Sequence, residues 1–228
     1  CICFDRPEPT FRKKKFPEYK AHRPPPPDDF KVQIPILYTI IKSLGLTCID
    51  LAGYEADDLI GTLATIKHNE GHTLLLTNDQ DCFQLVTDSV SVAMSRKGVS
   101  NLVEYTSEKV IERLGVLPSQ VIDYKALRGD VSDNIPGVKG IGEKTAVSLL
   151  KEYGTLEAIY KNLDTLSSKS VQKKLKENRE NAYLSQELAT IIRNAPIDQN
   201  LSTYTYVPDW VQIIETFKTY QFTNLIKK

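Results

Sequence analysis

The segment Arg128–Ala146, RGDVSDNIPGVKGIGEKTA, constrains this chain more than any other part of its sequence. Asp130 and Asp133 place two carboxylates three residues apart, and carboxylate oxygens are ligands that Mg²⁺ prefers. Three glycines then leave backbone amides open before a predicted helix: Gly137, Gly140 and Gly142. Such amides bind phosphate groups. Taken alone, these residues also fit an ordinary turn capped by Asp130. Together they predict an enzyme that cuts or transfers phosphodiesters.

Composition and charge are those of a globular protein rather than of a uniformly basic nucleic-acid binder. The 228 residues are 41% hydrophobic and 25% charged, which is typical of a chain that buries a core. The net charge is zero, yet residues 10–31 and residues 139–179 each carry an excess of four positive charges. Basic patches beside acidic clusters favour a metal-dependent nuclease, although charges of mixed sign also occur on ordinary solvated surfaces.

The cysteines and the apolar runs argue against several protein classes. No CxxC pair exists, which disfavours a zinc ribbon or a redox pair. Cys1, Cys3 and Cys48 lie in apolar runs, so we expect small buried thiols, which suit a reducing compartment. No run approaches the roughly 18–20 apolar residues of a membrane span, so we expect no membrane contact.

Hydrophobic periodicity predicts an α/β part followed by a mostly helical part, divided near residue 106. The expected strands are 1–4, 46–51, 73–76 and 90–94, and helices are expected at 30–44, 55–68 and 82–85. This alternation indicates a mainly parallel sheet. The later expected helices are 107–114, 118–127, 143–153, 156–161, 171–179, 182–192 and 210–219.

Acidic residues follow three of the predicted strands, and ligands of open α/β sheets bind at the carboxyl ends of strands. These acids are Asp5, Glu55, Asp57, Asp58, Asp79 and Asp81. Glu55 and Asp58 share one face of a predicted helix, whereas Asp57 points elsewhere. Each group alone also fits a helix start or a turn. Because converging carboxylates repel one another, their recurrence predicts bound cations, namely two Mg²⁺ ions.

Several longer segments carry a resemblance to a known family. They are FD at 4–5, FRKKKFPEYKAHRPPPPDDF at 11–30, GYEADDLIGTLA at 53–64, TNDQDCFQL at 77–85, DYKALRGDVSDNIPGVKGIGEKTAVSLL at 123–150 and YQFTNLIKK at 220–228. In this order they resemble the 5′ nucleases, the family of flap endonucleases and of the 5′-nuclease domain of bacterial DNA polymerase I. The resemblance is closest to the polymerase I type and covers nearly the whole chain.

The resemblance implies a resolvase-like or PIN-like α/β core in residues 1–106 and a helical DNA-binding subdomain in residues 107–228. Residues 11–30, the arch segment, resemble part of the helical arch over the family's active site. Residues 123–150 resemble its helix–three-turn–helix element. The implied metal-site acids are Asp5, Glu55, Asp57, Asp58, Asp79, Asp81, Asp130 and Asp133.

The resemblance also implies the remaining site residues. Arg12, Lys20 and Arg23 match arch residues near the substrate's 5′ end and scissile phosphate. The residues that match the grip on duplex phosphates, often aided by K⁺, are Gly137, Lys139, Gly140, Gly142 and Lys144. The implied reaction is hydrolysis of DNA at a 5′ flap, nick or 5′ end with two Mg²⁺ ions, for which Mn²⁺ substitutes.

Two departures from the family pattern qualify this expectation. The family begins some tens of residues earlier, with a strand that bears another metal-site Asp. Asp79 and Asp81 belong to the acidic loop at residues 77–81, and Gln80 stands between them where the family usually has a basic residue. A monomer is expected, in the bacterial cytoplasm at the nucleoid or in an organelle, with a polymerase domain in the same natural protein as a further implication.

Other functions fit parts of the sequence. The given sequence lacks the family's first strand and its Asp, and this leaves open a structure-specific DNA-binding module without catalysis. The α/β core by itself also allows an RNA-cleaving nuclease, although residues 137–142 point to duplex DNA. A haloacid-dehalogenase-like enzyme is disfavoured, because no DxD pair follows the first predicted strand.

Overall fold

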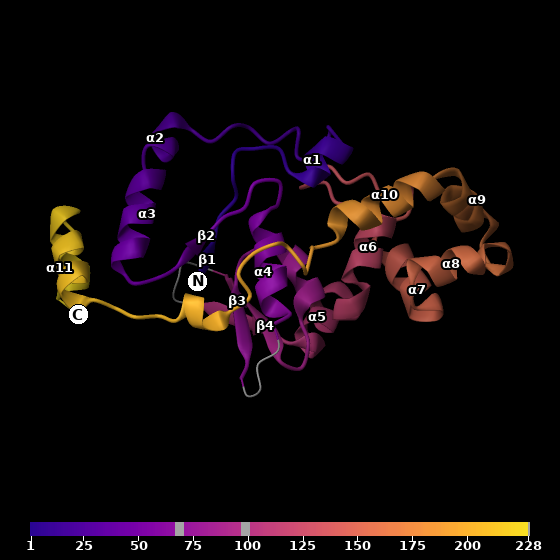
Figure 1. The fold of residues 1–228 in the computed structure, drawn as a ribbon. Helices are drawn as coiled ribbons and strands as arrows, with labels where there is room; N and C mark the ends of the chain where they lie inside the picture. The colour runs from indigo at the N-terminus through magenta and orange to yellow at the C-terminus, as the bar shows by residue number, and fades with distance from the viewer. Residues whose placement is uncertain (67–70, 97–100, 228) are drawn as a thin grey trace.

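The computed structural model describes residues 1–66, 71–96 and 101–227, with two small sheets and a helical region (Figure 1). β1 (Ile2–Cys3) pairs in parallel with β2 (Cys48–Ile49). β3 (Thr73–Leu76) pairs in parallel with β4 (Val90–Ser95). β5 (Leu102–Tyr105) pairs antiparallel with β4. The expected mainly parallel α/β core is therefore confirmed, and β5 is an addition that the sequence pattern did not indicate.

Helix α4 (Ala56–Ala64) joins the two sheets, which do not pair with each other. It contacts β1, β3 and the 3-10 helix η1 (Gln80–Leu85). An apolar cleft of about 480 Å³ lies between β1 and β3. Packing on α4, rather than strand pairing, therefore holds the sheets together. The helix was expected to reach residue 68, but it ends at Ala64, and residues 67–70 lie outside the described part.

The cysteines differ from the sequence expectation. Cys1 is exposed, Cys3 and Cys48 are partly buried, and only Cys82 is fully buried. The prediction of three buried thiols was wrong because β1 and β2 form a sheet of only two short strands, which leaves one side of each strand uncovered. All four cysteines are free thiols.

The helical region follows β5 and matches most of the expected helices. Its elements are α5 (Ser107–Leu114), η2 (Pro118–Gln120), α6 (Val121–Arg128), α7 (Glu143–Tyr153), α8 (Leu156–Lys161), η3 (Leu163–Thr165), α9 (Lys169–Glu177) and α10 (Arg179–Ala189). Helix α6 packs against α10, α7 and η1. It therefore links the helical region to the acidic loop of the α/β part.

One hydrophobic core crosses the expected boundary at residue 106. Phe83 and Val92 from the α/β part belong to the same buried cluster as Leu127 and Leu150 from the helical part. The boundary thus marks a change of secondary structure within continuous packing. The division into two domains at this residue stays a prediction.

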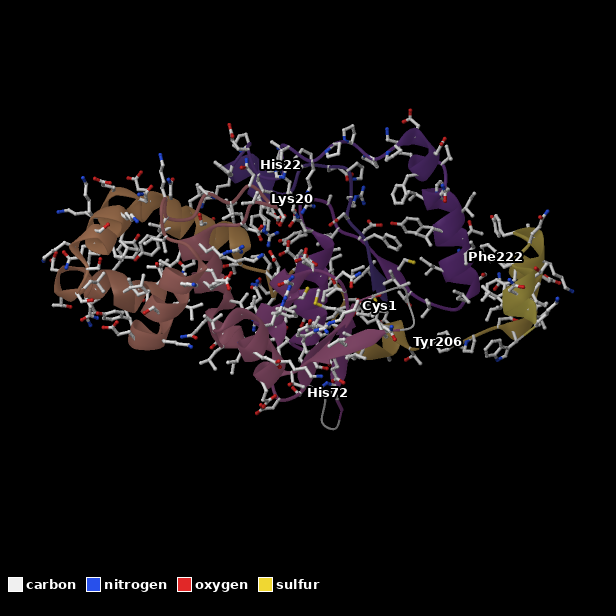
Figure 2. All side chains as sticks on the ribbon, turned by 180° about the vertical axis from the view of Figure 1, so that it is seen from behind. Cys1, Lys20, His22, His72, Tyr206 and Phe222 are labelled. Carbon is white, nitrogen blue, oxygen red and sulfur yellow. The ribbon has the colours of Figure 1, made fainter. Side chains whose placement is uncertain are left out.

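The remaining helices are α1 (Phe11–Lys15), α2 (Asp28–Lys31), α3 (Ile34–Ser43), η4 (Leu201–Tyr204), α11 (Trp210–Thr219) and α12 (Thr223–Ile226). α3 and α11 contact each other at the end of the molecule opposite to α8 and α9 (Figure 1). Tyr206 lies on the connection that leads from η4 to this end, where Phe222 also lies (Figure 2). The single helix expected at 30–44 is split, because Pro35 lacks the amide hydrogen needed to continue α2 and instead occupies the first turn of α3.

Asp123 on α6 holds three helices of this region in place. Its side chain is 8% exposed, and it accepts hydrogen bonds from the Leu156 amide at 2.9 Å and from Gln186 Nε2 at 2.6 Å. We expect Asp123→Ala to lower the free energy of unfolding by about 2–3 kcal/mol, because both donors lose a charged, buried acceptor. Urea unfolding checks this, with Asp164→Ala at an exposed position as the control. Equal stability of the two variants would contradict the assigned role.

Candidate active site

Three carboxylates converge at the ends of β1, β2 and β3. Asp5 follows β1 and accepts a hydrogen bond from the Ala56 amide at 2.7 Å, at the start of α4. Asp57 lies in the first turn of α4, and Asp79 caps η1 by accepting from the Asp81 amide at 2.9 Å. Within residues 1–66, 71–96 and 101–227, no basic side chain forms an ion pair with Asp5, Asp57 or Asp79. We name these three residues the open carboxylate group.

The electrostatics of Asp57 reflect this crowding. Burial and the neighbouring charges of Asp79, Glu55 and Asp5 raise the pKa of Asp57 to about 6, against a smaller opposing effect of Lys20. The Cys82 thiol lies 3.7 Å from Asp57 Oδ1 and donates to it. A site that disfavours carboxylate charge to this extent is one where a bound cation stabilises the ionised form.

Glu55 and Asp58 lie on one side of the start of α4, as the helical spacing predicts, and both pair with Arg12. Asp58 is 0% exposed and forms a two-pronged ion pair with Arg12, at 2.8 Å and 2.7 Å. The same carboxylate accepts from the Glu55 and Ile192 amides. Every Asp58 oxygen is therefore already bonded within the protein.

Arg12 is also committed to internal contacts. It is 2% exposed and donates to the Leu188 and Thr190 carbonyl oxygens at 2.9 Å and 2.6 Å, besides its pair with Asp58. The expectations that Arg12 contacts substrate phosphate and that Asp58 contacts metal therefore disagree with this geometry. Buried and mutually paired, the two residues tie α1 to α4 and to the end of α10.

The arch segment is anchored to the turn that carries Asp133. The Lys20 amide donates to the Asp133 carbonyl at 2.9 Å, and Arg23 Nη2 donates to the Asp133 carboxylate at 2.6 Å. Lys20 has a φ of 53°, in the left-handed region that a non-glycine residue rarely adopts. Its ammonium lies 3.0 Å from Glu55 Oε1. Lys20 and Arg23 thus lie beside Glu55 and Asp133, and their role at a substrate phosphate stays a prediction.

Tyr19 was not predicted from the sequence, yet it lies at the centre of this contact. Its hydroxyl is 3.1 Å from both Glu55 Oε2 and Asp133 Oδ2, and the side chain is 3% exposed. Burial first, and then the two carboxylates, raise the pKa of Tyr19 far above its usual range. The phenol therefore stays protonated, and its single proton is donated to one of the two acids at a time. The sequence signal that could have identified Tyr19 was an aromatic residue next to Lys20 in the arch segment.

Lys125 is the second residue that the sequence reading missed. It is buried on α6 and forms ion pairs with Asp81 and, at 2.7 Å, with Asp130. Burial tends to raise the pKa of Asp130, but Lys125 and the bonds from Ser132 outweigh it and lower that pKa to about 2. The signal for this residue was a lysine on the otherwise apolar face of a predicted helix, within the segment that resembles the DNA-binding element.

The turn after α6 departs in one respect from the expected phosphate grip. The Gly137 amide donates to the buried Ser185 hydroxyl at 2.9 Å, so it is not open to a ligand. A Cβ at this position would lie 2.3 Å from the Gly129 nitrogen, and φ is +62°. Gly137 is therefore required by packing. Gly140 and Gly142 are exposed as expected, together with Lys139 and Lys144, and α7 begins at Glu143 without a side-chain cap.

A cleft of about 710 Å³ connects the acidic loop to this turn. Acidic and basic side chains share its wall: Asp79, Asp81, Asp130 and Glu143, with Arg113, Lys125 and Arg128. Asp133 does not line this cleft, and its carboxylate lies among Tyr19, Lys20 and Arg23. The predicted acids therefore form three groups: the open carboxylate group, Glu55 with Asp58 and Asp133, and Asp81 with Asp130.

The donor chemistry of the open carboxylate group fits a hard divalent cation. No basic side chain in the described ranges forms an ion pair with this group, and the burial and crowding of Asp57 favour an added positive charge. In the part of the chain that the structure describes, however, no three His, Cys, Asp or Glu side chains are close enough to enclose a metal ion by themselves. The side chains thus fit a metal by their chemistry and leave room for ligands beyond these three.

The buried pair of Arg12 and Asp58 is testable by a conservative change. We expect Arg12→Lys to lower the free energy of unfolding by about 3–5 kcal/mol, because a lysine cannot reproduce the planar fork and leaves Asp58 poorly paired. Chemical denaturation measures this, with Lys14→Met on the exposed side of the same helix as the control. A loss below that of the control would rule out this role for the pair.

Comparison with known proteins gives the same order of parts. The family model for the 5′-3′ exonuclease N-terminal resolvase-like domain matches residues 1–115. The model for the 5′-3′ exonuclease C-terminal SAM fold matches residues 116–210. DNA polymerase I of Bacillus subtilis is 40% identical over 229 residues, which span 100% of this chain and 26% of that protein. The chain thus spans about a quarter of the length of the curated relative it matches.

Solved structures share the fold at lower sequence identity. T5 5′-exonuclease with bound zinc ions superposes with a TM-score of 0.68 at 23% identity, over 95% of this chain and 80% of that one. The catalytic core of Rad2 in complex with DNA substrate gives a TM-score of 0.59 at 21% identity, over 95% of this chain and 72% of that one. Within the described residues, every helix is too short or too polar to cross a bilayer. On the strength of the two consecutive family matches, the chain belongs to the 5′-3′ exonuclease family.

Proposed function

We propose that this chain hydrolyses DNA phosphodiesters at a 5′ flap, nick or 5′ end, with two Mg²⁺ ions, in primer or flap removal. The observation that carries the proposal is the open carboxylate group, whose Asp79 lines a cleft that is bounded by Glu143 at the start of α7, next to the exposed Gly142 and Lys144. In the proposed complex, the turn at residues 139–144 binds the phosphates of a DNA duplex while the end of that duplex lies at the metal site. The printed names of the relatives and of the T5 and Rad2 structures support the same activity.

Different carboxylates are proposed to bind each of the two cations. Asp5, Asp57 and Asp79 would hold the first ion, and Asp81 and Asp130, with Asp133 nearby, would serve the second. Bound there, the ions supply an activated water and stabilise the charge of the leaving 3′ oxygen. Mn²⁺ has the same preference for oxygen ligands and is proposed as a substitute. No nucleophilic Ser or Cys is required.

The basic residues act on the phosphates. Lys20 and Arg23 stand at the base of the arch segment, where they neutralise charge on a phosphate close to the acids. Lys139 and Lys144 flank the exposed glycines of the turn and bind duplex phosphates without reading the sequence. A K⁺ ion at this turn would add to the same grip. Arg12 positions α1 rather than contacting the substrate.

A second function, structure-specific DNA binding without catalysis, has one observation in its favour. Among the described residues, no three candidate ligands form an enclosed metal site. In that case the turn at residues 139–144 retains the duplex and the open carboxylate group stays too wide to hold an ion. Direct comparison of binding with cleavage separates the two functions.

The cellular setting follows from the proposed substrate. The relatives named DNA polymerase I are about four times as long as this chain, so we propose that a polymerase accompanies the nuclease in the natural protein. Because the proposed substrate is a DNA end, we propose that the enzyme acts at the bacterial nucleoid or in an organelle. A monomer suffices, because all the proposed site residues come from one chain.

Cleavage of a 5′-labelled flap DNA tests the proposed function. We expect a short 5′ product with Mg²⁺ and none with EDTA. Asp57→Asn should slow cleavage by at least about 100-fold, because the open carboxylate group loses a charged ligand. Flap binding in Ca²⁺ should remain, and Asp88→Asn at an exposed position serves as the control. Wild-type binding without any cleavage would instead establish the second function.

The duplex grip is tested by its salt dependence. Lys139→Ala and Lys144→Ala should each weaken DNA binding equally for unrelated sequences and reduce the slope of log K against log salt by about 1. Lys161→Ala, exposed on α8, is the matched control. Fluorescence anisotropy between low and moderate salt measures the slopes. Slopes that stay at the wild-type value would remove these lysines from the interface.

A further inference from the structure

Lys125 differs from the other lysines at the site in its burial and its partners. Its side chain is 7% exposed, and its ammonium forms ion pairs with Asp81 from η1 and Asp130 from the turn after α6. These two acids are 49 residues apart in the sequence, and one ammonium pairs with both of them. Both carboxylate oxygens of Asp130 have partners. Oδ2 accepts from Lys125, and Oδ1 accepts from the Ser132 amide and hydroxyl at 2.8 Å and 2.6 Å.

The balance of charge makes this arrangement informative. Two carboxylates brought together without a cation repel each other, and burial increases the cost. The open carboxylate group bears the same kind of crowding without an ion pair to any described residue, whereas Asp81 and Asp130 share Lys125. The two groups therefore differ in their need for an added cation. Asp5, Asp57 and Asp79 lack one, and Asp81 with Asp130 already has a positive charge.

The cleft beside Lys125 offers space for its ammonium group. Lys125 lines the cleft of about 710 Å³ together with Tyr124, Arg128 and Glu143. A lysine has four flexible side-chain bonds, so rotation moves the ammonium into this space without a backbone shift. There it would meet Glu143 or, when DNA is bound, a phosphate.

We propose that Lys125 is an internal counter-ion that occupies the position of a divalent cation between Asp81 and Asp130, so that metal binds there only when the ammonium moves into the cleft. This inference rests on the proposed function for the identity of the acids as a metal site. It follows that the two metal positions fill in order, the open carboxylate group first. Lys125 is a positioning residue, since it acts through the two carboxylates.

Removal of the charge tests the competition directly, without DNA. In Lys125→Met, a second Mn²⁺ should bind about tenfold more tightly than in the wild type, because no ammonium competes for the acids. Electron paramagnetic resonance of free Mn²⁺ counts the bound ions and gives their affinities. In EDTA the variant should melt at a lower temperature than the wild type, and Mn²⁺ should raise its melting temperature by more.

Two further variants serve as controls for the Mn²⁺-binding and melting measurements. Lys125→Arg keeps the positive charge and should retain weak binding of the second ion. Lys151→Met, exposed on α7, should behave as the wild type in both measurements. Second-ion affinity in Lys125→Met that is equal to or weaker than in the wild type, with unchanged melting in EDTA, would overturn the proposal.

A measurement on the unmodified protein decides the matter even if Lys125→Met does not fold. Brief acetylation with an amine-reactive reagent, followed by peptide mass spectrometry, should label Lys125 several-fold more with saturating Mg²⁺ than with EDTA. Lys151 should be labelled equally in both. Unchanged protection of Lys125 while two ions are bound would overturn the proposal. A protein that binds two ions and labels as expected, yet leaves flap DNA intact, would contradict the proposed function and not the role of Lys125.

Discussion

The buried ion pair between Arg12 and Asp58 is the interaction on which the site geometry depends. It joins the first helix of the arch segment to α4, and through the Leu188 and Thr190 carbonyl oxygens it reaches the end of α10. A charge buried to this extent requires complete pairing, so the three elements hold one another in a single arrangement. Asp57, one residue before Asp58, is thereby aimed in a fixed direction, toward Asp5 and Asp79.

That arrangement sorts eight acids by their electrostatic partners. Glu55, Asp58 and Asp133 are neutralised by the arch residues, and Asp81 and Asp130 by Lys125. Among the described residues the open carboxylate group has no ion-pair partner, and its Asp79 lines the cleft. A nuclease of the proposed kind needs this asymmetry, because a surface that attracts a metal must also tolerate a polyanion. Basic residues at the arch and at the turn meet the second requirement, and their contacts with acids hold them in position.

Local signals in the sequence predicted much of the helical part. α5, α7, α8 and α11 have the predicted bounds, because caps such as Thr155 and Asp209 and glycines such as Gly115 act within a few residues of the helix end. β5 was not predicted, and β1 and β2 are shorter than predicted, since the extent of a strand depends on partners distant in the chain. The break at Pro35 was readable in principle, but the apolar spacing around it suggested one helix.

The sequence by itself determined the family, the order of its parts and the presence of eight acids, because motifs and strand ends are properties of neighbouring residues. Only the tertiary structure decided which partners each acid has. Asp57 and Asp58 are adjacent and chemically alike, yet one is open beside Asp79 and the other is sealed against Arg12. For the same reason, Gly137 serves packing rather than a phosphate, and Lys125, which was not predicted, pairs with two acids. Burial and pairing arise from contacts between segments far apart in the chain, and no local pattern records them.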